Sequence, residues 1–121
     1  MADNTSLVTT YVVNKTNQFV MLTLLIGGAE QTGTSTVELD TEILIEQGGD
    51  LFDFTIGKNK DLADRTLVIS TTISDTSRET NHTELIVRLK GGVIFREYAL
   101  SKEVDEGGKA IYFCEIDFFQ F

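Results

Sequence analysis

The sequence predicts an all-β protein, an antiparallel β-sandwich of about eight strands with an immunoglobulin-like or C2-like arrangement. Two observations carry this prediction. Apolar and polar residues alternate along most of the chain, and short segments rich in Gly, Asn and Asp separate the alternating runs. A chain of 121 residues is long enough for one hydrophobic core, so residues 1–121 are expected to form a single domain.

The first half of the chain contains four expected strands. Residues 7–13 are rich in β-branched side chains, and residues 19–26 are apolar on both faces apart from Thr23, as in a strand covered on both sides. Residues 36–46 alternate as one long strand with an acidic outer face. The short run 51–56 is expected to turn one face inward, and that face consists of Phe52, Phe54 and Ile56.

The second half continues the pattern after one possible helical turn at residues 58–65. Residues 66–74 alternate Leu and Ile with Ser and Thr, as in a half-buried strand. A three-residue loop, Lys90 to Gly92, is expected to join the next two strands, because this register pairs Leu89 with Val93 and keeps one face apolar. A glycine of the loop should then have a positive φ. The other face of this hairpin would gather Glu84, Ile86, Arg88, Ile94, Arg96 and Tyr98.

The last strand, residues 109–121, is unusually aromatic. Tyr112, Cys114, Ile116 and Phe118 form one face, which is expected to enter the core. The opposite face holds Ile111, Phe113, Phe119 and Phe121. Three alternatives stay open: an internal helix or loop covers these side chains, a bulge after Asp117 turns Phe119 inward, or the side chains form an exposed patch for a partner.

Composition limits the classes of partner. The net charge is −9, of which residues 1–57 contribute −7 and residues 58–121 contribute −2. A negative field repels phosphate groups and anionic lipids, so we expect no nucleic-acid binding and no binding to membrane surfaces. The longest apolar run, residues 19–29, is too short for a membrane span. With one cysteine and no pattern of a secretory signal, a soluble protein of the cytoplasm is expected.

No arrangement of residues suggests catalysis. The single histidine, His82, lies in a polar, turn-like stretch, and Cys114 lies on a core face with no feature that would lower the pKa of its thiol. Phosphate-binding, dinucleotide-binding and hydrolase motifs are absent from the sequence. We therefore expect a protein that is not an enzyme and that needs no cofactor.

Acidic residues near strand ends offer one alternative. Asp50, Asp53, Asp61 and Asp64 would supply the oxygen ligands that Ca²⁺ prefers if the fold brought their loops together. This would make the protein a small ligand-binding module for Ca²⁺ or a polar ligand. A third class is an acidic inhibitor or immunity-type protein that binds a basic partner.

The favoured interpretation is a non-catalytic structural or protein-interaction module that associates with itself through a sheet face or edge. The candidate contact residues are Phe113, Phe119 and Phe121. Arg88 and Arg96 are expected to complement the acidic strand 36–46 of another subunit.

Overall fold

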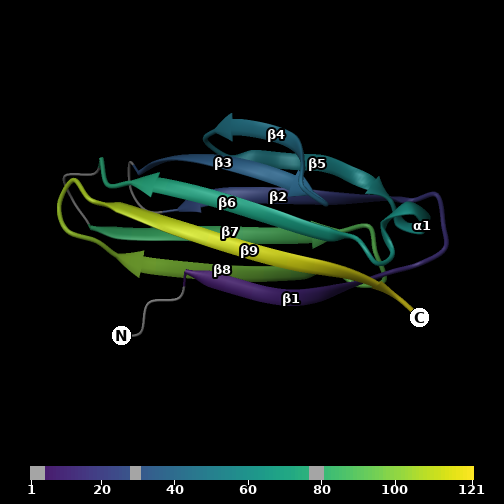
Figure 1. Cartoon of the computed structure of the whole chain (residues 1–121). Helices are drawn as coiled ribbons and strands as arrows, with labels where there is room; N and C mark the ends of the chain where they lie inside the picture. The colour runs from purple at the N-terminus through teal and green to yellow at the C-terminus, as the bar shows by residue number, and fades with distance from the viewer. Residues whose placement is uncertain (1–4, 28–30, 77–80) are drawn as a thin grey trace.

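The computed structural model describes residues 5–27, 31–76 and 81–121. Over these residues the chain forms nine strands and one short helix, packed as two stacked sheets (Figure 1), so the predicted β-sandwich is confirmed. The elements are β1 (Ser6–Val13), β2 (Phe19–Gly27), β3 (Thr32–Leu39), β4 (Glu42–Gly48), β5 (Leu51–Lys58), α1 (Asn59–Leu62), β6 (Thr66–Ser74), β7 (His82–Lys90), β8 (Arg96–Glu103) and β9 (Lys109–Gln120).

One sheet has five strands in the order β1-β9-β6-β3-β4, and the other has four in the order β5-β2-β7-β8. All neighbouring strands are antiparallel except β1 and β9, which run parallel. β1 stands at the end of the five-stranded sheet, so β9 is its one neighbour there, and the chain then crosses to β2 of the other sheet. The strands β1, β4, β5 and β8 are therefore the four edges of the sandwich.

The prediction of one long strand at residues 36–46 is wrong. The chain reverses at Asp40 and Thr41, whose φ angles are 49° and 75°, and this turn divides the segment into β3 and β4. Two positive φ angles match the twist of a two-residue hairpin. The Asp40 carboxylate holds the turn, since it accepts hydrogen bonds from Arg65 Nε at 2.7 Å and from the Thr66 N–H at 2.9 Å. Apolar alternation continues across so short a turn, and the pattern therefore gave no sign of it.

The inward face predicted for β5 is right for Ile56 and wrong for Phe52. Two residues of β5, Phe52 and Asp53, lie opposite the single residue Thr23 of β2, so the register shifts there. Asp53 has a φ of 46°, and its N–H donates to the Thr23 hydroxyl at 3.0 Å. This bulge reverses the faces of the strand. As a result Leu51 is buried, whereas Phe52 is 68% exposed.

The hairpin between β7 and β8 has a longer loop than predicted. Leu89 pairs with Arg96, so residues 91–95 form the loop, and the predicted pair of Leu89 with Val93 is wrong. The expected positive φ is present at Gly91, at 95°. The additional loop residues contact β1: the Gly92 N–H donates to the Tyr11 hydroxyl at 3.0 Å, and the Val93 N–H donates to the Val12 carbonyl at 3.0 Å.

The helical turn expected within residues 58–65 is confirmed as α1. Its first residue, Asn59, is fully buried and connects three segments of the chain. The Asn59 Nδ2 donates to the carbonyls of Gln18 and Gly91, both at 2.8 Å, and the Asn59 Oδ1 accepts from the Asn14 N–H at 3.1 Å. Within the described residues, no helix has the length and apolar character needed to cross a membrane.

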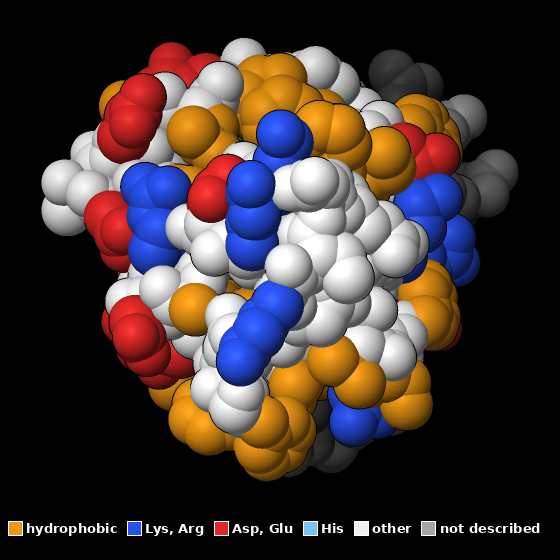
Figure 2. Space-filling model, turned by 90° about the vertical axis from the view of Figure 1, so that its right-hand side faces the viewer, with side chains coloured by type: hydrophobic (Ala, Val, Ile, Leu, Met, Phe, Trp, Pro, Cys, Tyr) orange, Lys and Arg blue, Asp and Glu red, His pale blue; other side chains and the backbone are white. Residues whose placement is uncertain are grey.

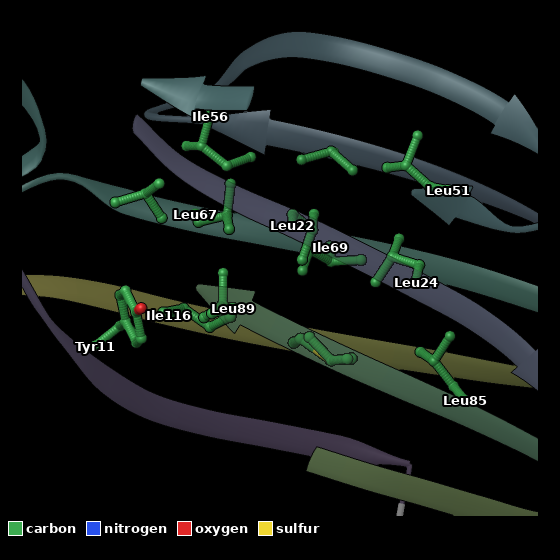
Figure 3. Close-up of a cluster of buried hydrophobic side chains, with 14 of the residues drawn as sticks. Tyr11, Leu22, Leu24, Leu51, Ile56, Leu67, Ile69, Leu85, Leu89 and Ile116 are labelled. Atoms are coloured by element: carbon green, nitrogen blue, oxygen red, sulfur yellow. The ribbon is translucent and has the colours of Figure 1, made fainter. Parts of the chain in front are cut away.

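The core fills the space between the two sheets. Figure 3 shows side chains of both sheets pointing toward one another, with Leu22 and Leu89 of the four-stranded sheet facing Leu67 and Ile69 of the five-stranded sheet. Two pairs of buried hydroxyl groups satisfy each other: Ser35 with Thr71 at 2.8 Å, and Thr83 with Tyr112 at 2.6 Å. Buried polar groups of this kind need such partners to be tolerated.

Candidate interaction surface

Strand β9 is fixed on both sides, which settles the direction of its side chains. It pairs with β6 in one continuous register, from Ser74 opposite Lys109 to Thr66 opposite Asp117. Its parallel register with β1 is also unbroken. The side chains therefore alternate along the strand, and the predicted inward face is confirmed by the burial of Tyr112, Cys114, Ile116 and Phe118.

The opposite face of β9 is open to solvent. Phe113 is 42% exposed, Phe119 is 44% exposed and Phe121 is 89% exposed. No bulge follows Asp117, because the register with β1 continues to Gln120. The alternative in which Phe119 turns inward is therefore wrong. Exposed aromatic side chains on a strand this firmly held are available for contact with another surface.

The residues beside these aromatics explain their exposure. Phe113 lies between Ser6 of β1 and Ser70 of β6, and such small side chains cannot cover a ring. Phe119 and Phe121 cover each other in part, with their ring centroids 5.1 Å apart in an edge-to-face arrangement. We call the exposed apolar residues of this face the β1–β9 surface: Val8, Ile111, Phe113, Phe119 and Phe121.

Two acidic residues divide the β1–β9 surface. Glu115 and Asp117 lie on the same face of β9, between Phe113 and Phe119. Asp117 Oδ1 accepts a hydrogen bond from the Thr66 hydroxyl at 2.7 Å. Figure 2 views the end of the sandwich at which the C-terminus lies, and hydrophobic side chains gather along its lower rim, where β1 and β9 end. The surface thus consists of exposed apolar side chains with two carboxylates among them.

The edge strand β1 adds a second feature, its free backbone. The Phe113 N–H donates to the Thr5 carbonyl at 2.9 Å, so the odd-numbered residues of β1 direct their backbone groups toward β9. The even-numbered residues then direct theirs away from the sheet. Val12 agrees with this alternation, because its carbonyl accepts from Val93 of the β7–β8 loop. The N–H and C=O groups of Ser6, Val8 and Thr10 consequently form an open edge.

Strand β1 lacks the features that usually protect an edge. Its sequence, SLVTTYVV, contains no charged residue and no proline, and its pairing with β9 contains no bulge. The other three edges differ. β4 carries Glu42 and Glu46, β5 carries Asp53 within a bulge, and β8 carries charged residues at both ends. Charges and bulges discourage edge-to-edge pairing, so β1 is the edge best suited to accept another strand.

The structure separates the two arginines that the sequence grouped together. Arg88 faces the outer side of the four-stranded sheet, where its Nε pairs with Glu97 of the same chain. Arg96 lies opposite Leu89, on the face that β8 turns toward the core, although its side chain is exposed at the end of the strand. Since the acidic segment 36–46 is also divided by a turn, the expected complementary strands are not present in the form predicted.

The four aspartates proposed as calcium ligands do not converge. Asp50 precedes β5 and accepts the Ile26 N–H at 2.7 Å, whereas Asp61 and Asp64 follow β5 at the opposite end of that strand. Asp53 lies between them and pairs with Lys90 Nζ at 2.8 Å. Among residues 5–27, 31–76 and 81–121, no three His, Cys, Asp or Glu side chains are grouped so that they could hold a metal ion.

A shallow depression on the four-stranded sheet was not predicted from the sequence. It has a volume of about 410 Å³, and Phe52 and Phe95 are among the residues that line it. The charged groups that line it already pair with each other, Arg88 with Glu97 and Lys90 with Asp53. The lysine beside Asp53 holds the pKa of that carboxyl below its usual range. These pairs leave few groups of the depression to recognise a ligand.

Cys114 and His82, the residue types most often used in catalysis, lie in different surroundings. Cys114 is fully buried, and burial raises the pKa of its thiol to about 12, which keeps it protonated and unreactive at neutral pH. His82 lies at the start of β7, and its Nδ1 is 2.6 Å from Glu103 Oε1 of β8. Neither residue offers an activated nucleophile beside a base.

The sequence contained only a weak signal for the β1 edge. β1 is a run of eight uncharged residues, but the nine residues of β2 and the nine of β6 are uncharged as well. That run identifies a strand without protection, but only the order of the strands in the sheet places it at an edge.

Comparison of the chain with protein-family models, with curated proteins and with solved structures found no match.

Proposed function

We propose that this protein is a non-catalytic interaction module that associates with itself through the β1–β9 surface. The observation that supports the proposal best is the exposure of Phe113, Phe119 and Phe121 on a strand whose backbone is held on both sides. Aromatic residues contribute strongly to protein interfaces, and a rigid strand loses little entropy when a partner binds to it.

The chemistry of the chain supports a binding role over a catalytic one. The thiol of Cys114 is buried, and the exposed apolar groups form a face rather than a pocket. Exposed apolar patches mark surfaces that contact a partner, and the β1–β9 surface is such a patch.

The experiment that tests this proposal is the solution mass of the chain, measured by light scattering during gel filtration over a range of loading concentrations. The wild-type protein is expected to exceed the monomer mass of 13.4 kDa. Phe119→Ser/Phe121→Ser is expected to shift the mass toward 13.4 kDa while the protein stays folded, because both side chains lie outside the core.

Phe52→Ser is the matched control, since Phe52 is also an exposed aromatic but lies on the other sheet. It should leave the mass unchanged. A wild-type protein that stays at 13.4 kDa at every concentration contradicts the proposal. Added Ca²⁺ should change neither mass nor melting temperature, and a calcium-dependent rise in melting temperature would instead favour the ligand-binding module.

A further inference from the structure

We propose that two copies of the chain pair through their β1 strands, antiparallel and with Val8 of one copy opposite Val8 of the other, so that the two five-stranded sheets become one continuous sheet. This inference rests on the proposed self-association and adds an edge contact to it, in which Val8 is the residue of the β1–β9 surface that meets the other copy. It follows from three properties of β1: its open backbone, its lack of charge and the part of its edge that is already covered.

The open backbone calls for a strand as the occupant. Ser6, Val8 and Thr10 direct N–H and C=O groups away from β9, and an extended segment is the partner that satisfies such a row. β1 of a second copy is already extended and held in place by β9, so it needs no ordering in order to bind.

Charge favours a second copy of β1 over the other three edge strands. β1 has no charged side chain, so two copies meet without like charges at the contact. The nearest acidic residue on the same face is Glu115, which lies beside Val8. In the paired sheet, Glu115 of one copy would lie three strand spacings, roughly 14 Å, from Glu115 of the other. That distance exceeds the screening length of about 8 Å at physiological salt.

The covered end of the edge selects the register. The Val12 carbonyl already accepts the Val93 N–H, which leaves Ser6, Val8 and Thr10 as the free hydrogen-bonding residues. An antiparallel partner uses all three only when Val8 faces Val8 and Ser6 faces Thr10. This arrangement has a twofold axis at Val8 and forms about six backbone hydrogen bonds, two for each facing pair.

The side chains of this register are compatible. On the outer face, Val8 meets Val8 and Ser6 meets Thr10, which are β-branched or small polar residues suited to cross-strand contacts. Val8 itself is 68% exposed in the isolated chain and would lose much of that exposure. The two β1–β9 surfaces would then lie side by side on one face of the joined sheet.

The register can be tested by disulfide cross-linking under a mild oxidant such as oxidised glutathione. In Val8→Cys, the two cysteines would have Cα atoms about 5.5 Å apart, within the range that a disulfide spans. We expect a cross-linked dimer on a non-reducing gel. Cys114 should not interfere, because it is fully buried.

Thr10→Cys is the matched control. Thr10 faces Ser6 of the other copy, so two cysteines at position 10 would be four residues apart along the strands, roughly 14 Å, which is too far for a disulfide. Efficient cross-linking of Thr10→Cys, or none of Val8→Cys in a protein that light scattering shows to be oligomeric, overturns the pairing while leaving the proposed self-association intact.

A charged and an uncharged substitution of Val8 give a second readout, the dissociation constant of the dimer. Val8→Lys places two ammonium groups together at the twofold axis and should raise the dissociation constant of the dimer by about tenfold or more. Val8→Thr keeps a β-branched residue and should change it by less than about threefold. Equal effects of the two substitutions contradict the pairing. A monomer at all concentrations contradicts both the pairing and the proposed function.

Discussion

The backbone N–H of Val93 donates a hydrogen bond of 3.0 Å to the carbonyl of Val12, which joins a loop of the four-stranded sheet to the edge strand of the five-stranded sheet. The bond has two consequences. It anchors the β7–β8 loop, and it closes one end of the β1 edge, so that only Ser6, Val8 and Thr10 are left to pair with another strand.

The anchored loop predicts that Gly91→Ala strongly destabilises the protein. Gly91 has a φ of 95°, and a Cβ at this position would lie 2.0 Å from the Phe19 carbonyl oxygen. Since backbone blocks the space, we expect a loss of about 3 kcal/mol or more in the free energy of unfolding, measured by urea denaturation. Gly49→Ala is the control: its φ is also positive, at 78°, but nothing lies within 4 Å of the added Cβ. It should lose only about 1 kcal/mol. Equal losses for the two variants would show that Gly91 is needed for its φ alone.

Asn59→Ala should destabilise the same end of the sandwich. The substitution removes the partner of three backbone groups, the carbonyls of Gln18 and Gly91 and the N–H of Asn14. Because Asn59 is fully buried, water does not replace the lost bonds without rearrangement, and a cost of about 3 kcal/mol or more is expected. Asn17→Ala, in the neighbouring exposed loop, should change the stability by less than about 0.5 kcal/mol. A small effect at Asn59 would mean that this amide does not hold the three segments together.

Thr41→Gly should stabilise the protein. Thr41 has a φ of 75°, which is costly for a β-branched residue, whereas glycine adopts it without strain. We expect the free energy of unfolding to rise by about 0.5 to 1 kcal/mol, less than the full strain because glycine also makes the unfolded chain more flexible. Thr36→Gly, in the middle of β3, serves as the control and should lower the stability. A lower melting temperature for Thr41→Gly would show that the turn does not strain Thr41.

The buried thiol predicts a loss of stability at alkaline pH. Burial raises the pKa of Cys114 from 9.0 to about 12, so the native state holds this proton more tightly than the unfolded chain does. The contribution is therefore complete below about pH 9 and is lost as the pH rises toward 12. Burial also raises the pKa of Tyr11, which acts in the same direction. In Cys114→Ala, stability measured between pH 9 and 11 should fall less steeply with pH, by up to about 1.4 kcal/mol per pH unit. Identical slopes in the two proteins would contradict the assignment to Cys114.

The parts of the fold that follow from alternation were predictable, and those that depend on tertiary partners were not. The two faces of β9 follow from its sequence because neither neighbour of the strand interrupts the register. The bulge at Asp53 depends on the hydroxyl of Thr23, thirty positions away. The five-residue loop after Lys90 depends on Tyr11 and Val12. Propensity and pattern carry no information about such distant partners.

The candidate surface divides in the same way. The exposed aromatics of β9 could be named from the sequence, although whether Phe119 turned inward depended on the absence of a bulge. The edge at β1 could not be named, because its exposure results from parallel pairing with β9, the last strand of the chain. Residues that meet across so large a separation are fixed only by the completed sheet.

Amide hydrogen exchange of β1, followed by NMR at increasing protein concentration, tests the central claim most directly. In a single copy, the N–H groups of Ser6, Val8 and Thr10 point away from the sheet, whereas that of Thr9 faces β9 and provides an internal reference. We predict that Val8 and Thr10 exchange rapidly in dilute solution and become protected as the concentration rises, while Thr9 stays protected throughout. Rapid exchange of Val8 and Thr10 at every concentration would contradict pairing through β1.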